Sequence, residues 1–318
     1  MVENHILAIG GGKGGTGKSL IAVSIGICLA GRGNDVLLID ADLGTANLHT
    51  FLGLEPPQIC LSDFVTKKKS AIDGVIIKTG INNLKLISGG KDMIGIANLS
   101  YGQKVKILSS IKKLNHKYIL IDLGPGTSFN ILDFFLISHC GILVTSPEPT
   151  SIENTYRFIR GLIFRYLRKV ISQKVVKSLI DKGVRQGEGH KFHSVFDLLE
   201  AIEKIEPELG QSIASYLSTL DIKLIVNQAR TNRDRAIGQN MAIAARKYLG
   251  IQIDFLGNVS YDNNVRKGLL QSKPLMAYFP HSIAFKEITE ISQKISPRYQ
   301  LEIDFSADQS SLKPISED

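Results

Sequence analysis

A glycine-rich run near the start of the sequence contains two lysines and ends in a serine. Residues 10–19 read GGGKGGTGKS, and the spacing G-x-x-x-x-G-K-[ST] runs from Gly12 to Ser19. Glycines are typical where backbone N–H groups converge on a phosphate, because side chains would obstruct that approach. A chance glycine-rich turn is the alternative, but the run also follows a strand pattern and precedes a helix pattern. We predict a nucleotide-phosphate loop formed by Gly12, Lys13, Gly14, Gly15, Thr16, Gly17, Lys18 and Ser19.

The polar side chains of this loop suit ATP with Mg²⁺. Lys18 would place its charge on the β- and γ-phosphates and so assist hydrolysis. The Ser19 hydroxyl would bind Mg²⁺, which prefers oxygen ligands in an octahedral arrangement. Lys13 is an addition to the plain motif. A further phosphate contact and a solvated loop lysine both account for it.

Carboxylates follow two further strand patterns. Asp40 is the last residue of the run DVLLID, and Asp42 follows two positions later. Asp122 is the last residue of the run YILID, which precedes Leu-Gly-Pro-Gly. Asp122 would hold Mg²⁺ through water, and Asp40 would bond either to a water on Mg²⁺ or to the phosphate loop. Asp42 would orient the water that attacks the γ-phosphate. Glycines on both sides of Pro125 predict a loop that changes conformation with the γ-phosphate. The alternatives are a solubilising role for Asp42 and a cap on Gly126 for Asp122.

The elements that position these residues alternate between short apolar runs and helical patterns. A helix is predicted over 19–30, and residues 72–78 form the weakest strand signal, at an edge. The alternation predicts an α/β fold with a mostly parallel sheet, helices on both faces and the ligand at the C-terminal strand ends. Together with the glycine-rich loop, it predicts a P-loop NTPase. Strands are predicted at 5–10, 35–40, 83–88, 117–122, 141–146, 221–227 and 253–260.

Composition limits the class of protein. With 318 residues, 43% of them hydrophobic, the chain can form one large core. The longest apolar runs fall short of the roughly 20 residues that span a bilayer, and no secretory signal pattern is present, so we expect a cytoplasmic protein. Three widely spaced cysteines predict buried thiols and no metal cluster.

The positive charge is concentrated in one segment. Residues 157–191 hold ten Lys and Arg against two acids, which equals the whole net charge of +8. We predict an ATPase domain over 1–296, interrupted at 157–220 by a helical insertion whose two halves form a hairpin. Residues 157–191 are its basic arm, and 297–318 form an acidic C-terminal tail. The arm's apolar residues should pack on the domain, with its cations exposed.

The loop around Lys13 resembles the deviant phosphate loop of the MinD/ParA ATPases. The runs DADLGTANLHTFLGL (40–54) and EPTSIENTYRFI (148–159) look like the FlhG/FleN branch, whose members set flagellar number and position. The resemblance covers residues 1–160 and 221–295. It implies a homodimer that forms around ATP, in which Lys13 reaches the partner's phosphates and hydrolysis resets the dimer.

The resemblance also assigns Asn227, at the end of the run LIVN, to reading the adenine edge; a turn asparagine is the alternative. The sequence departs from flagellar and MinD-type members in three ways: it starts directly at the first strand, its last residues are polar and acidic, and it carries the basic arm.

Two functions remain open at this stage. The first is an ATPase switch that positions a cellular structure, flagella among the candidates, through a protein partner. The second is a ParA-like DNA-binding partition protein that uses the basic insertion. The arm's mixture of apolar and basic residues also suits a membrane surface, so a peripheral location at a membrane or at the nucleoid accompanies either function.

Overall fold

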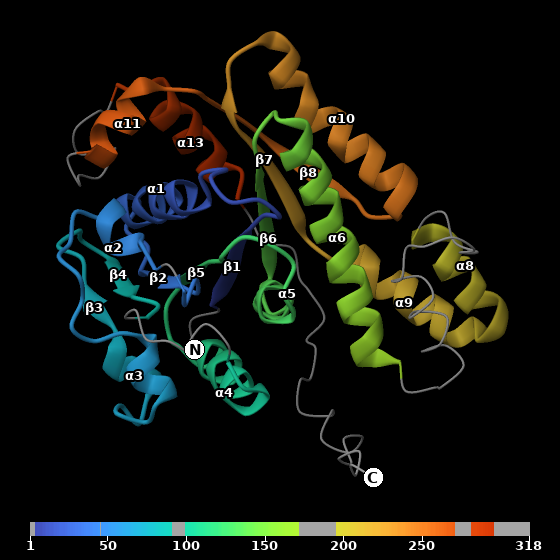
Figure 1. Ribbon diagram of the computed structural model, residues 1–318, viewed down its shortest axis with the longest axis horizontal. Helices are drawn as coiled ribbons and strands as arrows, with labels where there is room; N and C mark the ends of the chain where they lie inside the picture. Colours follow the sequence, from blue (N-terminus) through green and yellow to red (C-terminus); the bar gives the residue numbers. More distant parts are fainter. Residues whose placement is uncertain (1–3, 45, 91–98, 172–194, 271–280, 296–318) are drawn as a thin grey trace, which may run out of the picture.

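The computed structural model describes residues 4–44, 46–90, 99–171, 195–270 and 281–295 (Figure 1). Its centre is an eight-stranded sheet in the order β3-β4-β2-β5-β1-β6-β7-β8, in which all neighbours run parallel except β3 and β4. The predicted strands are confirmed. The strands are β1 His5–Gly10, β2 Val36–Asp40, β3 Ile77–Lys78, β4 Leu84–Ile87, β5 Tyr118–Asp122, β6 Cys140–Thr145, β7 Ile222–Ala229 and β8 Ile253–Ser260.

Both faces of this sheet are buried, because alternate side chains along each strand enter two different hydrophobic clusters. In β1, Ile6 and Ala8 enter one cluster, whereas Leu7 and Ile9 enter the other. This burial explains why the strands read as continuous apolar runs in the sequence.

Helices cover the two faces. Helices α1 and α13 pack on one face, and α4, α5, α6 and α10 pack on the other (Figure 1). This arrangement confirms the predicted α/β class. The helices are α1 Lys18–Gly31, α2 Leu48–Phe51, α3 Leu61–Val65, α4 Tyr101–Lys112, α5 Phe129–Leu136, α6 Pro149–Val170, α8 Val195–Ile205, α9 Pro207–Thr219, α10 Asn232–Leu249, α11 Asn263–Leu270 and α13 Ile283–Gln293, with a 3-10 helix at Ile72–Val75.

Helix α6 corrects the predicted start of the insertion. The boundary drawn at residue 157 falls inside this helix, which runs without a break from Pro149 to Val170. Its apolar residues recur every three or four positions, so one stripe faces the core. The buried members of the stripe are Phe158, Ile159, Leu162, Ile163 and Leu167. Residues 157–170 are therefore part of the domain's own core.

Cations of the same helix are paired inside the protein. Asp133 of α5 is fully buried and forms ion pairs with Arg165 and Lys169 of α6 and with Lys104 of α4. Burial pulls the pKa of Asp133 upward, but the three cations outweigh this effect and hold the pKa below its ordinary value. Two of the ten cations of the predicted arm thus serve the packing of three helices.

A helical hairpin follows α6, but the segments that form it differ from those predicted. Helices α8 and α9 form it, joined at Glu206, so both legs come from the second half of the predicted insertion. It packs on the domain, where Tyr216 stacks on Tyr166 of α6 with ring centroids 3.5 Å apart. The remainder of the basic arm, 172–194, and the acidic tail, 297–318, lie outside the described residues. Within the described ranges, no helix has both the length and the apolar character needed to cross a membrane.

Candidate functional site

The predicted phosphate loop connects the C-terminal end of β1 to the first turn of α1. Strand β1 lies between β5 and β6 in the middle of the sheet, where the strand order reverses, and such points hold the ligand in open α/β sheets. Gly15 and Gly17 have φ angles of 78° and 90°, a region that favours glycine. A Cβ atom on Gly12 would collide with the carbonyl oxygen of Asn154 in α6. The loop therefore needs glycine both for its turns and for its packing.

Two residues at the end of β7 hold this loop. The amide of Asn227 donates from Nδ2 to the carbonyl oxygen of Thr16 at 2.8 Å, and its Oδ1 accepts from the backbone N–H of Gln228 at 2.9 Å. Gln228, with a φ of 64°, donates from Nε2 to the carbonyl oxygen of Gly15 at 3.0 Å. The sequence predicted Asn227 but missed Gln228, which the same strand-end position would have indicated.

Asp40 and Asp122 lie side by side at the ends of β2 and β5, where they are register partners. Asp40 is buried and accepts hydrogen bonds from the backbone N–H groups of Asp42 and Leu48, at 3.1 and 3.0 Å. Burial, reinforced by the charge of Asp122, raises the pKa of Asp40 to about 8. Asp40 thus organises the loop that carries Asp42.

Asp122 faces the phosphate loop. It forms a hydrogen bond with the side chain of Ser19, and burial raises its pKa to about 7 despite this bond and the nearby charge of Lys18. Among the described residues, the buried Oδ1 atom of Asp122 has no hydrogen-bond partner. An orphaned carboxylate oxygen next to a hydroxyl and a second carboxylate is a donor set of hard oxygens, which fits Mg²⁺. The predicted metal residues Ser19, Asp40 and Asp122 are brought together.

Lys18 is the first residue of α1, at the end of the loop, and it is buried. Its ammonium donates to the carbonyl oxygen of Lys13 at 3.2 Å. Desolvation lowers the pKa of Lys18, and the carboxylates of Asp122 and Asp42 oppose that effect. A positive charge is therefore held among carboxylates at the point where the phosphates are expected.

Asp42 lies against the loop that follows β5. A Cβ atom on Gly124 would come within 3.1 Å of the carboxylate carbon of Asp42, so glycine permits this close approach. The same loop is tied to the phosphate loop, since the N–H of Gly126 donates to the carbonyl oxygen of Gly11 at 3.3 Å. The predicted water-orienting residue, the predicted switch loop and the phosphate loop therefore form one assembly.

The side chain of Lys13 leaves this assembly and reaches the start of α6. Its ammonium forms an ion pair with Glu148 and donates to the hydroxyl oxygen of Thr150 at 3.0 Å. The Lys13 side chain is 36% exposed. The structure thus brings Lys18, Ser19, Asp40, Asp42 and Asp122 together and gives Lys13 a separate position.

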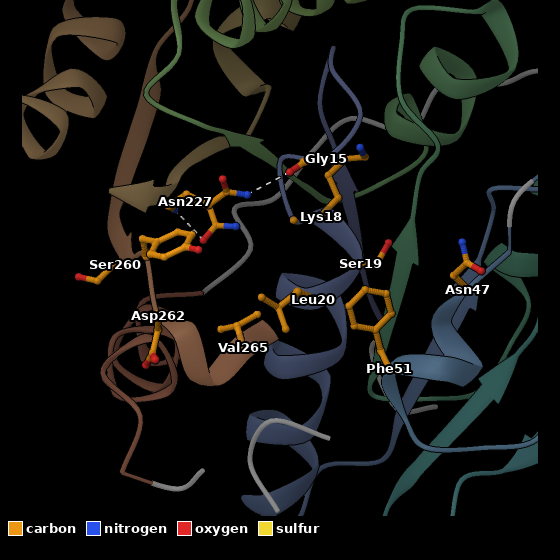
Figure 2. A pocket seen from close by; sticks show the side chains of 13 residues that line it. Gly15, Lys18, Ser19, Leu20, Asn47, Phe51, Asn227, Ser260, Asp262 and Val265 are labelled. Carbon is orange, nitrogen blue, oxygen red and sulfur yellow. Dashed lines mark hydrogen bonds between the residues drawn. The ribbon is translucent and has the colours of Figure 1, made fainter. Parts of the chain in front are cut away.

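A cavity of about 450 Å³ opens beside the loop (Figure 2), a size typical of small-ligand sites. Asn227 lines it, but its amide is bonded to the backbone of Thr16 and Gln228, so its predicted role in reading the adenine edge stays a prediction. The sequence analysis missed most of the cavity walls, which come from α1, the start of α2, the ends of β7 and β8, the loop after β8 and α11. These lining residues are Leu20, Asn47, Phe51, Gln228, Ser260, Tyr261, Asp262 and Val265.

Comparison with known proteins identifies the family of this chain. The sequence profile of the CobQ/CobB/MinD/ParA nucleotide binding domain matches residues 7–275. The chain belongs to this family. This membership confirms the resemblance to the MinD/ParA ATPases.

Individual relatives of this family member support the assignment. The antiactivator FleN of Pseudomonas aeruginosa is 24% identical over 292 residues, which is 92% of this chain and 86% of FleN. The septum site-determining protein MinD of Pyrococcus horikoshii, complexed with Mg-ADP, is 22% identical with a TM-score of 0.61, covering 92% of this chain and 95% of that one. In the MinC:MinD complex of Aquifex aeolicus, the matching chain is 19% identical with a TM-score of 0.57, covering 93% and 99%. These two structures share the fold of this chain, and the similarity to FleN agrees with the predicted resemblance to the FlhG/FleN proteins.

Proposed function

We propose that the chain is a Mg-ATP-dependent ATPase switch that dimerises on ATP and controls the position or number of a cellular structure through a protein partner. The observation that carries this proposal is the convergence of Lys18, Ser19, Asp122 and Asp42 at one glycine-rich loop, with Lys13 directed away from them. A simple nucleotide-binding protein has no need of the second lysine.

Binding would use the loop's backbone N–H groups and Lys18, which complement the negative charge of the phosphates. Ser19 and Asp122, with Asp40 behind them, would hold Mg²⁺ through their oxygen atoms. When bound, Mg²⁺ neutralises charge that develops on the transferred phosphoryl group. Asp42 would then accept a hydrogen bond from the attacking water and orient it, a positioning contribution typical of phosphoryl transfer.

The dimer is inferred from Lys13. The Lys13 ammonium points away from the phosphate loop of its own chain, so we assign it to the phosphates of a second copy, as the resemblance to the MinD/ParA ATPases implies. Dimerisation would create the surface that a partner recognises, and hydrolysis would remove that surface. The FleN and MinD relatives support a regulatory output of this kind.

Sedimentation velocity tests the proposal directly. The protein with ATP and Mg²⁺ is expected to sediment as a dimer, and the protein with ADP as a monomer. Lys13→Ala should bind ATP yet stay monomeric. A wild type that remains monomeric with both nucleotides, or a Lys13→Ala protein with an unchanged ATP-dependent mass, would contradict the dimer.

The nature of the partner is tested through salt. Residues 172–194 retain five Lys and Arg, and we propose that this part of the insertion contacts the partner. Binding to DNA or to anionic vesicles that weakens steeply between low and moderate salt would favour the ParA-like alternative or a peripheral membrane location. A complex that resists salt would favour an apolar protein interface in the cytoplasm.

A further inference from the structure

The Lys13 ammonium contacts a carboxylate and a hydroxyl of its own chain, those of Glu148 and Thr150. Glu148 is the N-cap residue of α6, and its side chain makes no capping hydrogen bond, so its carboxylate is available to Lys13. Thr150, two residues further on, accepts the second hydrogen bond from the Lys13 ammonium. The lysine is thus held at two points by one helix start.

This helix start is rigid. Pro149 restricts the backbone of Glu148 to the extended region, which agrees with its ψ angle of 137°. The buried hydroxyl of Ser151 accepts from the N–H of Ser146 at 3.0 Å and bonds to the hydroxyl of Thr145 at 2.9 Å, which ties the first turn of α6 to the end of β6. The position of the Glu148 backbone is therefore set by the sheet.

The backbone of the phosphate loop is held against the same helix. Gly12 packs so closely on the carbonyl oxygen of Asn154 that a Cβ atom would not fit. At Lys13 itself, the carbonyl oxygen accepts from Lys18, which turns it toward the interior. Because the backbone is held at both residues, contact between Lys13 and Glu148 orders only the two side chains.

We infer that Glu148 is a positioning residue that retains Lys13 on its own subunit and thereby raises the protein concentration at which the ATP-bound dimer forms. The inference rests on the proposed function, in which Lys13 contacts the partner's phosphates. That contact requires Lys13 to leave Glu148 and Thr150. The retaining pair and the dimer compete for one ammonium.

The size of the effect follows from exposure. The side chains of Lys13 and Glu148 are 36% and 59% exposed, and exposed ion pairs shift an equilibrium roughly 1.5- to 5-fold. A symmetric dimer breaks two such pairs, so removal of the carboxylate should lower the dimer dissociation constant roughly 2- to 30-fold. The retaining pair is exposed and therefore weak, whereas a contact with the partner's triphosphate would be less exposed to water and would meet a larger negative charge.

Carbodiimide cross-linking tests the retained state. This reagent activates a carboxylate, and an adjacent amine displaces the activating group to form an amide bond. Nucleotide-free wild type should yield a Lys13–Glu148 cross-link within one chain, identified by peptide mass spectrometry of the monomer. The yield should fall when the non-hydrolysable analogue AMPPNP and Mg²⁺ drive dimerisation. An absent cross-link in the nucleotide-free protein, or an equal yield in the dimer, would overturn the inference.

The threshold itself is measured by sedimentation equilibrium with AMPPNP and Mg²⁺. Glu148→Gln should dimerise at lower protein concentration than the wild type, and Glu148→Asp should restore part of the wild-type threshold. Thr150→Val removes a contact with Lys13 without changing the charge. If Thr150→Val also dimerises at lower protein concentration, the effect comes from loss of the retaining contacts and not from loss of a negative charge alone. Glu153→Gln is the matched control, since Glu153 is an exposed acid of the same helix that pairs with Arg157.

The outcomes separate this inference from the function on which it rests. A wild type that stays monomeric with AMPPNP refutes the proposed dimer, and the inference about Glu148 fails with it. If the wild type dimerises and Glu148→Gln dimerises equally well or more weakly, the inference about Glu148 is refuted and the proposed dimer stands. A shift in Glu148→Gln with none in Thr150→Val assigns the effect to charge near the phosphates and also refutes retention.

Discussion

Replacing Asp133 by asparagine removes a fully buried carboxylate that three cations share. Arg165 contacts it with two nitrogen atoms, at 2.7 and 2.8 Å, and Lys104 and Lys169 contact it at 2.5 and 2.9 Å. The side chains of these cations are 7 to 13% exposed. The substitution keeps the shape of the side chain but leaves three nearly buried cations without this carboxylate.

The expected loss is large. Removing one partner of a buried ion pair costs about 3–5 kcal/mol, because the remaining charge stays desolvated. The cations retain some access to water, so we expect the lower end, about 3 kcal/mol. For a chain of this length that corresponds to a fall in melting temperature of about 5 °C, from the usual unfolding entropy per residue.

Urea unfolding followed by far-ultraviolet circular dichroism measures this loss, since the chain has no tryptophan to report by fluorescence. Glu153→Gln on α6 is the control, because both partners of that pair are more than half exposed and the change should stay within about 0.5 kcal/mol. An Asp133→Asn protein within about 1 kcal/mol of the wild type would refute the reasoning, since the cations would then be solvated in the folded state.

Acid provides a second measurement on the same variant. The folded-state pKa of Asp133 lies below its ordinary value of 3.8, so its stabilisation is present above that pH and is lost as pH falls through the folded-state pKa. The stability difference between wild type and Asp133→Asn should therefore be constant near neutral pH and should narrow in strong acid. A difference that is unchanged in strong acid would contradict an ionised Asp133.

Three further predictions concern the site and the insertion. Asp42→Ala should bind ATP and dimerise but release phosphate at least roughly tenfold more slowly, because the water loses its orientation; normal turnover would remove Asp42 from the mechanism. Gly12→Ala should fold yet lose nucleotide affinity, measured by calorimetry, because its Cβ atom displaces the loop from Asn154; wild-type affinity would contradict that packing. Replacing 172–194 by a Gly-Ser linker of equal length should leave ATP binding intact and abolish partner, DNA or vesicle binding in pull-down and co-sedimentation; lost ATP binding would make the segment part of the catalytic domain.

The sequence predicts the site wherever a strand leads into it. Lys18, Ser19, Asp40 and Asp122 all follow apolar runs, and parallel strands bring their carboxyl ends to one edge of the sheet. That rule locates residues along the sheet without any knowledge of strand order.

Contacts that depend on strand order are not predictable in this way. Glu148 lies 135 residues from Lys13, and the two meet because β6 is adjacent to β1. The start of the insertion was wrong for a related reason: the cations of α6 suggested an exposed arm, but Asp133, which pairs with Arg165, lies on a different helix. The distribution of charges along the sequence does not show that folding brings a buried carboxylate of another helix next to these cations.

The hydrogen bonds from β7 to the phosphate loop also determine which way the loop's own N–H groups point. A trans peptide unit is planar, with its carbonyl and the following N–H on opposite sides. The carbonyl oxygens of Gly15 and Thr16 are turned toward Gln228 and Asn227, so the N–H groups of Thr16 and Gly17 point the opposite way. These donors are already oriented in the protein without nucleotide. Phosphate binding therefore costs little conformational entropy of the loop. Side chains more than two hundred residues away thus lower the entropic cost of nucleotide capture.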